Sequence, residues 1–206
     1  MVVSEPTMSG KSTFVHNVLH DKDIFSSPPG TVYWFHGGDS DIGLEGRGYV
    51  VKQGLPDSFT DIPEGSVVVL DDLMDEAKDH PGVTALFTKL VHHKWLFVIN
   101  ITQNVFLNSK DTRTRRLNSQ YMALFKNPSD VTQIHTIGRQ MYPGSGGFMA
   151  CANANATKHP YGYLFIDLRQ ETPNELRVRT HVLKHEFPLK IYKQPIDLAR
   201  MILENE

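Results

Sequence analysis

Short apolar runs alternate along the chain with segments in which apolar residues recur at helical spacing. The runs that indicate strands are rich in β-branched and aromatic residues and lie at 31–36, 66–70, 95–101 and 121–125. An apolar stub at 1–4 and a short run at 49–51 extend this series. The run 66–70 is almost continuously apolar, which is expected of a central parallel strand covered on both faces.

The segments between these runs predict helices. Phe14, Val15, Val18 and Leu19 share one helical face directly after a polar loop, and further helices are expected at 81–93 and from about 129 to 141. Residues 144–147 are glycine-rich and predict a flexible joint. Strands alternating with helices predict an α/β fold with a mostly parallel sheet flanked by helices.

The last third of the chain has a different pattern. Runs at 163–168 and 176–182 predict paired strands around a turn at 172–174, so a C-terminal β-hairpin should extend the sheet. We expect a single domain over 1–206, with a core at 1–143 and C-terminal strands and a tail at 144–206. The first strand is short for its expected place in the sheet, which suggests that residues precede it.

Composition limits the class of protein. The chain has 206 residues, of which 40% are hydrophobic, enough for one substantial core. No apolar run approaches the roughly 20 residues of a membrane span, and no signal peptide is recognisable, so an intracellular protein with no membrane partner is expected. Cys151 is the single cysteine, which excludes an internal disulfide.

Charge is unevenly distributed although the net charge is only −2. Residues 1–100 carry more acidic than basic side chains, and residues 101–206 carry more basic than acidic ones. The basic half could contact nucleic acid. An acidic metal site in the first half explains the imbalance equally well.

A phosphate-binding loop is indicated between the first strand and the first helix. The P-loop pattern is glycine, four residues, then Gly-Lys-Ser/Thr, and Gly10, Lys11 and Ser12 match its end. Backbone amides there would bind phosphates at a helix N-terminus, Lys11 would reach the β- and γ-phosphates of ATP, and Ser12 would ligate Mg²⁺. The predicted nucleotide-binding residues are Thr7, Met8, Ser9, Gly10, Lys11, Ser12 and Thr13.

The first glycine of that pattern is replaced by Glu5. Its carboxylate would lie near a polyanion, and it replaces a residue that lets the loop approach the phosphates closely. Nucleotide affinity is therefore expected to be weakened. A Ser/Gly turn that merely caps a helix, with Lys11 in solvent, is the alternative interpretation.

Two carboxylates follow the apolar strand at 66–70, as in a Walker B motif. We expect Asp71 to hold Mg²⁺, directly or through water, and Asp72 to orient or deprotonate the attacking water. The alternative is a core strand that ends in a polar turn.

The next apolar strand ends at Gln103, which is placed to contact the γ-phosphate. Its amide can both donate to phosphate and accept from water. A polar residue that merely caps the end of the strand is the alternative interpretation. An arginine often neutralises charge in phosphoryl transfer, and Arg113 is our choice among the arginines near 112–116 and Arg139. Any of these arginines could instead grip DNA or be solvated. The ten histidines show no zinc-binding spacing, and Tyr33, Trp34 and Phe97 are expected in the core.

Four segments together resemble a known family. The runs at 6–14, 70–74, 101–104 and 124–128 are similar to the packaging ATPases of Maverick/Polinton elements and adintovirus-like DNA viruses, which group with poxvirus packaging ATPases in the FtsK/HerA superfamily. This resemblance implies ATP hydrolysis coupled to threading of double-stranded DNA into a capsid. It also implies a homo-oligomeric ring with active sites between subunits, and capsid or portal proteins as partners at the site of virion assembly.

Two other classes of function remain open from the sequence. A nucleotide or small-molecule kinase would need a lid and an acceptor pocket, which the basic region at 110–140 does not obviously supply. A non-catalytic binding or scaffold protein is favoured by Glu5. Phosphate release stimulated by duplex DNA would separate a motor from a kinase, and calorimetric nucleotide binding would address the scaffold.

Overall fold

A single mixed sheet forms the centre of the computed structural model, which describes residues 1–4, 10–21, 23–25, 27–38, 48–78, 80–103 and 118–194. Across the described residues the strand order is β3-β2-β4-β5-β1-β6-β7-β8-β9. The strands are β1 (Val2–Ser4), β2 (Val32–His36), β3 (Val50–Gln53), β4 (Val67–Asp71), β5 (Phe97–Thr102), β6 (Tyr121–Phe125), β7 (Tyr163–Asp167), β8 (Val178–Thr180) and β9 (Lys190–Tyr192).

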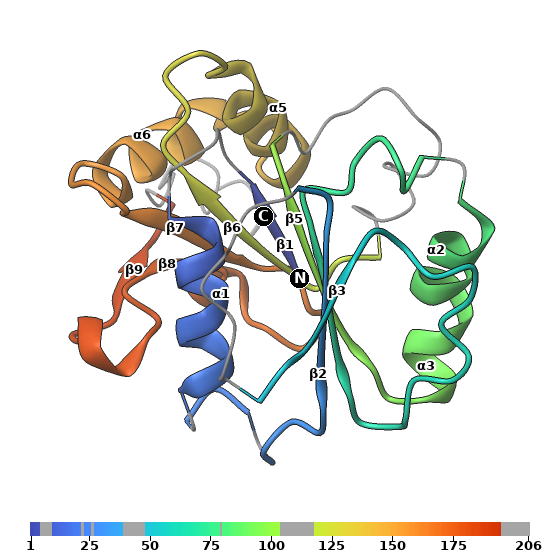
Figure 1. The fold of residues 1–206 in the computed structure, drawn as a ribbon. Helices are drawn as coiled ribbons and strands as arrows, with labels where there is room; N and C mark the ends of the chain where they lie inside the picture. The colour runs from blue at the N-terminus through green and yellow to red at the C-terminus, as the bar shows by residue number, and fades with distance from the viewer. Residues whose placement is uncertain are drawn as a thin grey trace, which may run out of the picture.

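Strand direction divides the sheet into two parts. The six strands from β3 to β6 are parallel, and β7, β8 and β9 are each antiparallel to the strand before them. The chain begins in β1, in the middle of the sheet (Figure 1). The α/β fold with a mostly parallel sheet and a C-terminal hairpin, predicted from the sequence, is confirmed.

Helices cover both faces of this sheet (Figure 1). They are α1 (Lys11–His20), α2 (Pro81–Ala85), a π-helical turn (Leu86–Leu90), α3 (Val91–His93), α5 (Thr132–Met141) and α6 (Gly146–Ala156). Helix α1 packs on one face through Phe14, Val15 and Val18, against a cluster that includes Val3 and Val69. The other face is covered by α2 and α3 over β2, β4 and β5, and by α5 and α6 over β1, β6 and β7.

Alternation along the strands explains how both faces are filled. Val67 and Val69 of β4 contribute to the cluster under α1, whereas Val68 and Leu70 contribute to the cluster under α2. Successive side chains of a strand point to opposite faces, so an unbroken apolar run is needed where both faces are covered. This is why β4, which is buried throughout, lacks the usual polar alternation.

Several elements differ from the sequence-based expectation. The expected helix at 81–93 contains a π-helical turn, and α5 begins at Thr132 because the side chain of Asn127 accepts from the amides of Ser129 and Asp130 in a turn. Helix α6, whose residues 146 and 147 were expected in a flexible joint, and strand β9 were not predicted. The 176–182 strand is shorter than expected, since only residues 178–180 pair in β8.

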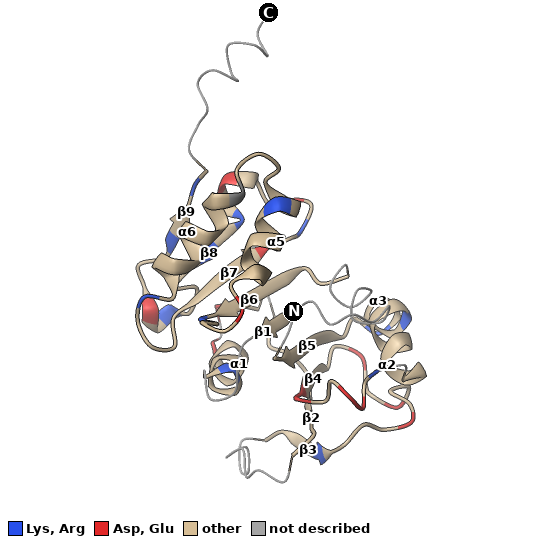
Figure 2. Cartoon of the chain, turned by 90° about the horizontal axis from the view of Figure 1, so that it is seen from above, with Lys and Arg blue, Asp and Glu red and all other residues tan. Residues whose placement is uncertain are grey.

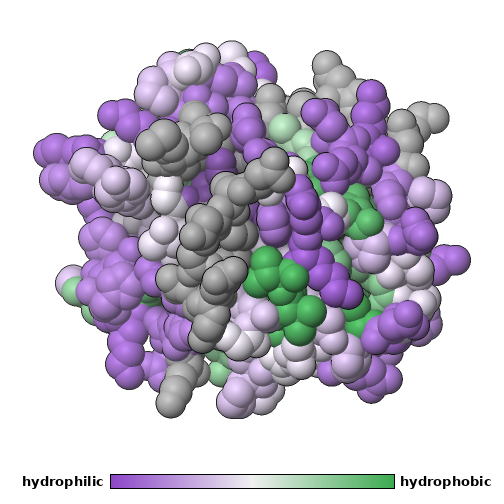
Figure 3. All heavy atoms as spheres, in the orientation of Figure 1, coloured by the Kyte–Doolittle hydropathy of each residue, from purple (hydrophilic) through white to green (hydrophobic). Residues whose placement is uncertain are grey.

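One face of the molecule is mostly polar. Figure 3 shows the face seen in Figure 1, where hydrophilic side chains predominate and hydrophobic ones are confined to smaller areas. In Figure 2, acidic residues gather in the loops beside β4 and α2, and basic residues are more frequent on the side of α6, β8 and β9. None of the helices in the described part of the chain has the length and apolar content that a membrane span requires.

Candidate functional site

Helix α1 begins at an unusual backbone position. Gly10, its N-cap, has φ +91°, and a Cβ atom there would lie 2.9 Å from Cδ1 of Tyr161. The position therefore requires glycine, both for its left-handed conformation and for the close ring. Gly10 has no side chain that could cap the helix, and the helix dipole favours an anion at this end.

Asp71 ends β4 beside this helix. Its Oδ2 accepts a hydrogen bond from the hydroxyl of Ser12 over 3.1 Å and another from the indole N–H of Trp34 over 3.2 Å. The residue is only 8% exposed. Burial raises the pKa of the Asp71 carboxyl, while the hydrogen bonds from Ser12 and Trp34 and the positive charge of Lys11 oppose that rise.

Asp72 follows in an exposed turn that two neighbours shape. It has φ +53°, which is uncommon for a residue other than glycine. A Cβ atom on Gly37 would lie 2.5 Å from the carbonyl oxygen of Asp72, so the turn also requires glycine there. The side-chain amide of Gln103 donates to Oδ1 of Asp72 over 2.9 Å. Because β4 and β5 are neighbours in the sheet, their polar ends meet at the same edge.

These groups line one cavity of about 730 Å³, a size typical of small-molecule and cofactor sites. Gly10, Lys11, Ser12 and Thr13 line it from the start of α1, and Asp71, Asp72 and Gln103 line it from the strand ends. The opposite side of the cavity comes from the C-terminal part of the chain, through Tyr161, Tyr163, Leu183, His185 and Glu186. The lining from the strand ends is thus acidic and amide in character, whereas the C-terminal segments contribute aromatic and aliphatic side chains together with His185 and Glu186.

The donor set beside α1 fits a magnesium ion. Mg²⁺ prefers hard oxygen ligands and is commonly bound through one or two carboxylates together with phosphates of the substrate. The hydroxyl of Ser12 and the carboxylate of Asp71 supply such oxygens within 3.1 Å of each other. The described residues contain no cluster of three or more His, Cys, Asp or Glu side chains that could hold a metal without a ligand's help.

The structure brings together most of the predicted site residues that it describes. Gly10, Lys11, Ser12, Thr13, Asp71, Asp72 and Gln103 all line the same cavity. Thr7, Met8, Ser9, Glu5 and Arg113 lie outside the described residues, so their predicted roles stay predictions. No sequence pattern indicated that Tyr161 or Leu183, which belong to the late segments, would line the cavity, or that Trp34 would contact Asp71.

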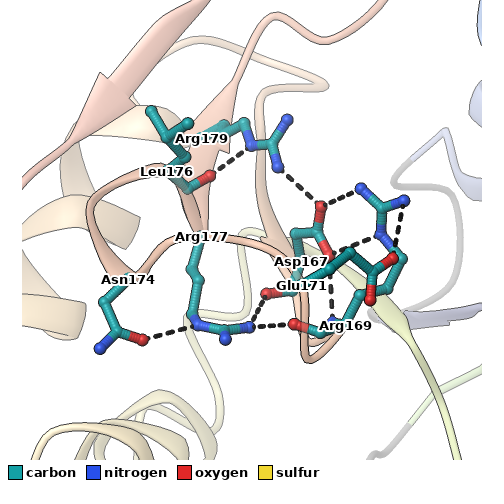
Figure 4. Close-up of polar contacts among 7 residues, drawn as sticks. All are labelled: Asp167, Arg169, Glu171, Asn174, Leu176, Arg177 and Arg179. Atoms are coloured by element: carbon teal, nitrogen blue, oxygen red, sulfur yellow. Dashed lines mark hydrogen bonds and ion pairs between the residues drawn. The ribbon is translucent and has the colours of Figure 1, made fainter.

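Another group of arginines has a structural role elsewhere. Arg169 and Arg179 both pair with Oδ2 of Asp167, over 2.9 and 2.7 Å, and the Asp167 side chain is 1% exposed (Figure 4). Arg177 donates to the carbonyl oxygens of Asp167 and Arg169. In the register of β6 and β7, Asp167 lies across from Tyr121 at one end of the strand pair, and Tyr163 lies across from Phe125 at the other end. This cluster therefore lies at the far end of the strand pair from the cavity.

The fold is that of the P-loop NTPases. The chain is similar to the genome-packaging NTPase B204 of Sulfolobus turreted icosahedral virus 2 in complex with AMPPCP, with a TM-score of 0.57, 14% identity, and coverage of 95% of this chain and 96% of that chain. The AMP complex of the same NTPase has a TM-score of 0.52 and 16% identity over 83% of this chain and 93% of that one.

A further similar structure is B204 described as the DNA-packaging ATPase from Sulfolobus turreted icosahedral virus. It has a TM-score of 0.52 and 15% identity, and the match covers 95% of this chain and 96% of that chain. No protein-family model and no curated protein sequence matches the chain significantly. At these identities the similarity establishes the shared fold.

Proposed function

We propose that this chain is an ATP-hydrolysing motor subunit that packages double-stranded DNA during virus assembly. The observation that carries the ATPase proposal is the hydrogen bond between Ser12, in the first turn of α1, and Asp71, at the end of β4. Ser12 and Asp71 line one cavity together with Gly10, Lys11 and Thr13, which supports joint binding of phosphate and metal there. The packaging part of the proposal is supported by the fold shared with B204 and by the family resemblance of the sequence.

Phosphate binding follows from the start of α1. Backbone amides without helical partners and the ammonium group of Lys11 would together neutralise the triphosphate. Ser12 and Asp71 would hold Mg²⁺, which when bound offsets negative charge on the β- and γ-phosphates. The burial of Asp71 strengthens this contact, because a carboxylate that few waters reach interacts more strongly with a cation.

The water that attacks the γ-phosphate would be oriented by Asp72. Its carboxylate is exposed to the cavity, and Gln103 fixes Oδ1 through the 2.9 Å hydrogen bond. The second carboxylate oxygen of Asp72 is the natural acceptor for a proton of that water. In this arrangement Gln103 either positions Asp72 or turns its amide to the γ-phosphate, and both actions require it at the end of β5.

The nucleoside would occupy the opposite end of the cavity. In this proposal Asp71 and Asp72 mark the γ-phosphate end on the side of β4 and β5, and β1 lies between these two strands and β6 in the strand order. The rest of the nucleotide then points toward β7, where Tyr161, Leu183 and His185 line the cavity. Tyr161 is 71% exposed and offers a ring face on which a base could stack.

We further propose a homo-oligomeric ring whose active sites are completed by an arginine of a neighbouring subunit, with Arg113 as the candidate. Double-stranded DNA and capsid or portal proteins would be its partners, at the intracellular site of virion assembly. A composite site suits a motor, because hydrolysis in one subunit then depends on the position of the next. The surplus of basic side chains in residues 101–206 supports contact with DNA phosphates.

An ATPase assay of the chain with and without duplex DNA tests this proposal. We expect Mg²⁺-dependent phosphate release that duplex DNA stimulates, and a mass in solution that corresponds to an oligomer. Lys11→Ala and Asp72→Asn should each abolish turnover. Hydrolysis that persists in either variant would refute the role assigned to that residue, and release of phosphate to an organic acceptor rather than to water would indicate a kinase.

Glu5 favours a second candidate, a nucleotide-binding or scaffold protein with little turnover. It stands where the loop pattern has its first glycine, and it brings a carboxylate toward the phosphates. Calorimetry distinguishes this candidate from the motor. Tight nucleotide binding without hydrolysis, in the presence of Mg²⁺ and duplex DNA, would support the binding protein.

A further inference from the structure

We propose that Trp34 is a positioning residue for the magnesium site, because its indole N–H holds the Asp71 carboxylate in the orientation that the ion requires. This inference rests on the proposed function. It adds a residue of β2 to the two elements that carry the proposed magnesium ligands, α1 with Ser12 and β4 with Asp71. Nothing in the sequence pattern distinguished Trp34 from an ordinary core residue.

Register places the two side chains on the same face of neighbouring strands. Trp34 of β2 lies opposite Val69 of β4, so Asp71 is two residues further along β4 and points to the same side. The indole Nε1 is 3.2 Å from Oδ2 of Asp71. The hydroxyl of Ser12 reaches the same oxygen over 3.1 Å. Two donors from different elements thus fix one carboxylate oxygen.

The indole itself is held firmly. Trp34 is 0% exposed, and its ring stacks on Tyr49 with a centroid distance of 6.0 Å and an interplanar angle of 14°. The Tyr49 hydroxyl lies 2.9 Å from Nδ1 of His16 and 3.1 Å from Nδ1 of His20, both on α1. Helix α1 also carries Ser12. Helix α1 therefore carries one donor to Asp71, Ser12, and contacts the other, Trp34, through Tyr49. This connection limits how far the two donors can move relative to each other.

The chemistry of the indole suits this task. Its N–H can only donate, so it stabilises the ionised carboxylate without competing for the metal. Hydrogen bonds to a ligating carboxylate orient it, and loss of such outer partners typically lowers metal affinity by about 10–100-fold. The competing explanation is structural: a buried indole N–H needs an acceptor, and Asp71 provides one. The two explanations differ in what happens to metal binding when the N–H is removed.

The test compares Trp34→Phe with Trp95→Phe. Phenylalanine keeps an aromatic ring at position 34 but has no N–H, and Trp95 is 79% exposed and is absent from the cavity lining, which makes it the matched control. Calorimetry would give the affinity of each protein for AMPPCP in Mg²⁺ and in EDTA. The measured quantity is the ratio of the two affinities, which reports the contribution of the metal to nucleotide binding.

We expect Trp34→Phe to reduce this ratio by about 10-fold. Its affinity for AMPPCP in EDTA should stay within about twofold of the unmodified protein, and Trp95→Phe should leave both values unchanged. A folded Trp34→Phe protein with an unchanged ratio would overturn the proposal. Absence of any Mg²⁺-dependent binding in the unmodified protein would instead overturn the proposed function, and this inference with it.

A second replacement addresses a Trp34→Phe protein that fails to fold. The chain has only two tryptophans, so in the Trp95→Phe background Trp34 alone is replaced when cells incorporate a tryptophan analogue. β-(3-Benzothienyl)alanine has the same bicyclic shape with sulfur in place of N–H, whereas 7-azatryptophan retains the N–H. The thienyl protein should show the reduced ratio and the aza protein should not. Equal ratios for the two would overturn the proposal.

Discussion

The side-chain amide of Gln103 donates a hydrogen bond to Oδ1 of Asp72 over 2.9 Å. This contact joins the ends of β5 and β4, two strands that are also neighbours in the sheet. The hydrogen bond connects the polar residues at the ends of the two strands, so the amide of Gln103 restricts the orientation of the Asp72 carboxylate. Asp72, with its exposed side chain and its φ of +53°, depends on this partner for a defined orientation.

Gln103→Ala should therefore lower kcat with little change in the KM for ATP. The variant keeps the phosphate-binding groups but leaves Asp72 without its donor, so the attacking water is less well oriented. We expect kcat to fall by about 10–100-fold, within the range typical of acid–base contributions. Steady-state kinetics measures both constants. A raised KM with an unchanged kcat would show that Gln103 binds ATP instead of orienting Asp72.

Asp71→Asn should stabilise the protein when nucleotide and metal are absent. Burial raises the pKa of Asp71 above its unfolded value, so the ionised carboxylate destabilises the fold at neutral pH. This cost disappears as the pH falls through the folded pKa and the carboxyl becomes protonated. We expect the variant to have a Tm higher by about 2–4 °C at pH 7.5, which corresponds to about 1 kcal/mol, and the difference to vanish near pH 4.

Thermal unfolding in EDTA across this pH range measures the effect. Asp72→Asn is the matched control, because Asp72 is an exposed neighbour and its replacement should change Tm far less. An Asp71→Asn protein that is less stable than the unmodified one at every pH would contradict the prediction.

Tyr161→Ala should weaken binding of ATP but not of tripolyphosphate. Loss of a stacked ring is expected to cost about 1 kcal/mol, or roughly fivefold in affinity, and tripolyphosphate has no base to lose contact with. Tyr161→Phe keeps the ring and should bind ATP normally. Calorimetry with both ligands separates the two possibilities. An equal loss for both would indicate that Tyr161 acts by supporting the turn at Gly10, against which its ring packs.

Glu5→Gly should raise the affinity for ATP. Removal of a carboxylate near the phosphates is expected to gain about 1 kcal/mol or more, and glycine restores the loop pattern. Glu5→Gln removes the charge without adding backbone freedom, so the pair of variants separates the two effects. Combined with Glu5→Gly, both Lys11→Ala and Asp72→Asn should still abolish hydrolysis. Unchanged ATP affinity in Glu5→Gly would show that the Glu5 side chain does not oppose binding of the phosphates.

Asp167→Ala should destabilise the fold and leave nucleotide binding intact. Asp167 is buried, and its removal leaves Arg169 and Arg179 without their shared acceptor, for an expected loss of about 2–3 kcal/mol. Burial acts to raise the pKa of Asp167, but the hydrogen bonds that Arg169 donates to its carboxylate outweigh burial and lower the pKa. The contribution of Asp167 to the free energy of unfolding is therefore complete above its pKa in the unfolded chain, which is about 4. This contribution is lost as the pH falls through the pKa in the folded protein.

Denaturant unfolding at pH 7 and below pH 4 checks this prediction. The free energy of unfolding of the variant should be much lower than that of the unmodified protein at pH 7, and this difference should be smaller below pH 4. Nucleotide affinity is the control, because the cluster lies at the opposite end of β6 and β7 from the cavity. A lost affinity in a folded Asp167→Ala protein would contradict this separation.

The parallel part of the fold could be predicted because its signals are local. The run at 67–70 is apolar on both faces, and Phe14, Val15 and Val18 repeat at helical spacing, so the pattern alone predicts a strand and a helix. The polar residues at the ends of β4 and β5 could then be placed together, since parallel neighbours end at one edge. That reasoning led to Asp71, Asp72 and Gln103 on a single cavity.

Helix α6 and the far side of the cavity could not be predicted in the same way. Met149, Ala152 and Ala156 form the buried stripe of α6, but alanines also occupy its other faces, so no apolar periodicity stands out. Its glycines at 146 and 147 suggested a joint rather than a helix start. Tyr161 and Leu183 reach the cavity through tertiary packing, which a local pattern does not encode.

The reversal of strand direction between β6 and β7 has a consequence for how such a site can diversify. The end of the cavity where we propose that phosphate binds is built from the carboxyl ends of parallel strands, whereas other lining residues precede or begin β7, which runs in the opposite direction. Exchanging side chains around Tyr161 could retune which nucleoside is accepted, while the hydrolytic half stays as it is. Nucleotide specificity and nucleotide hydrolysis would then be able to evolve separately, although one small sheet carries the residues for both.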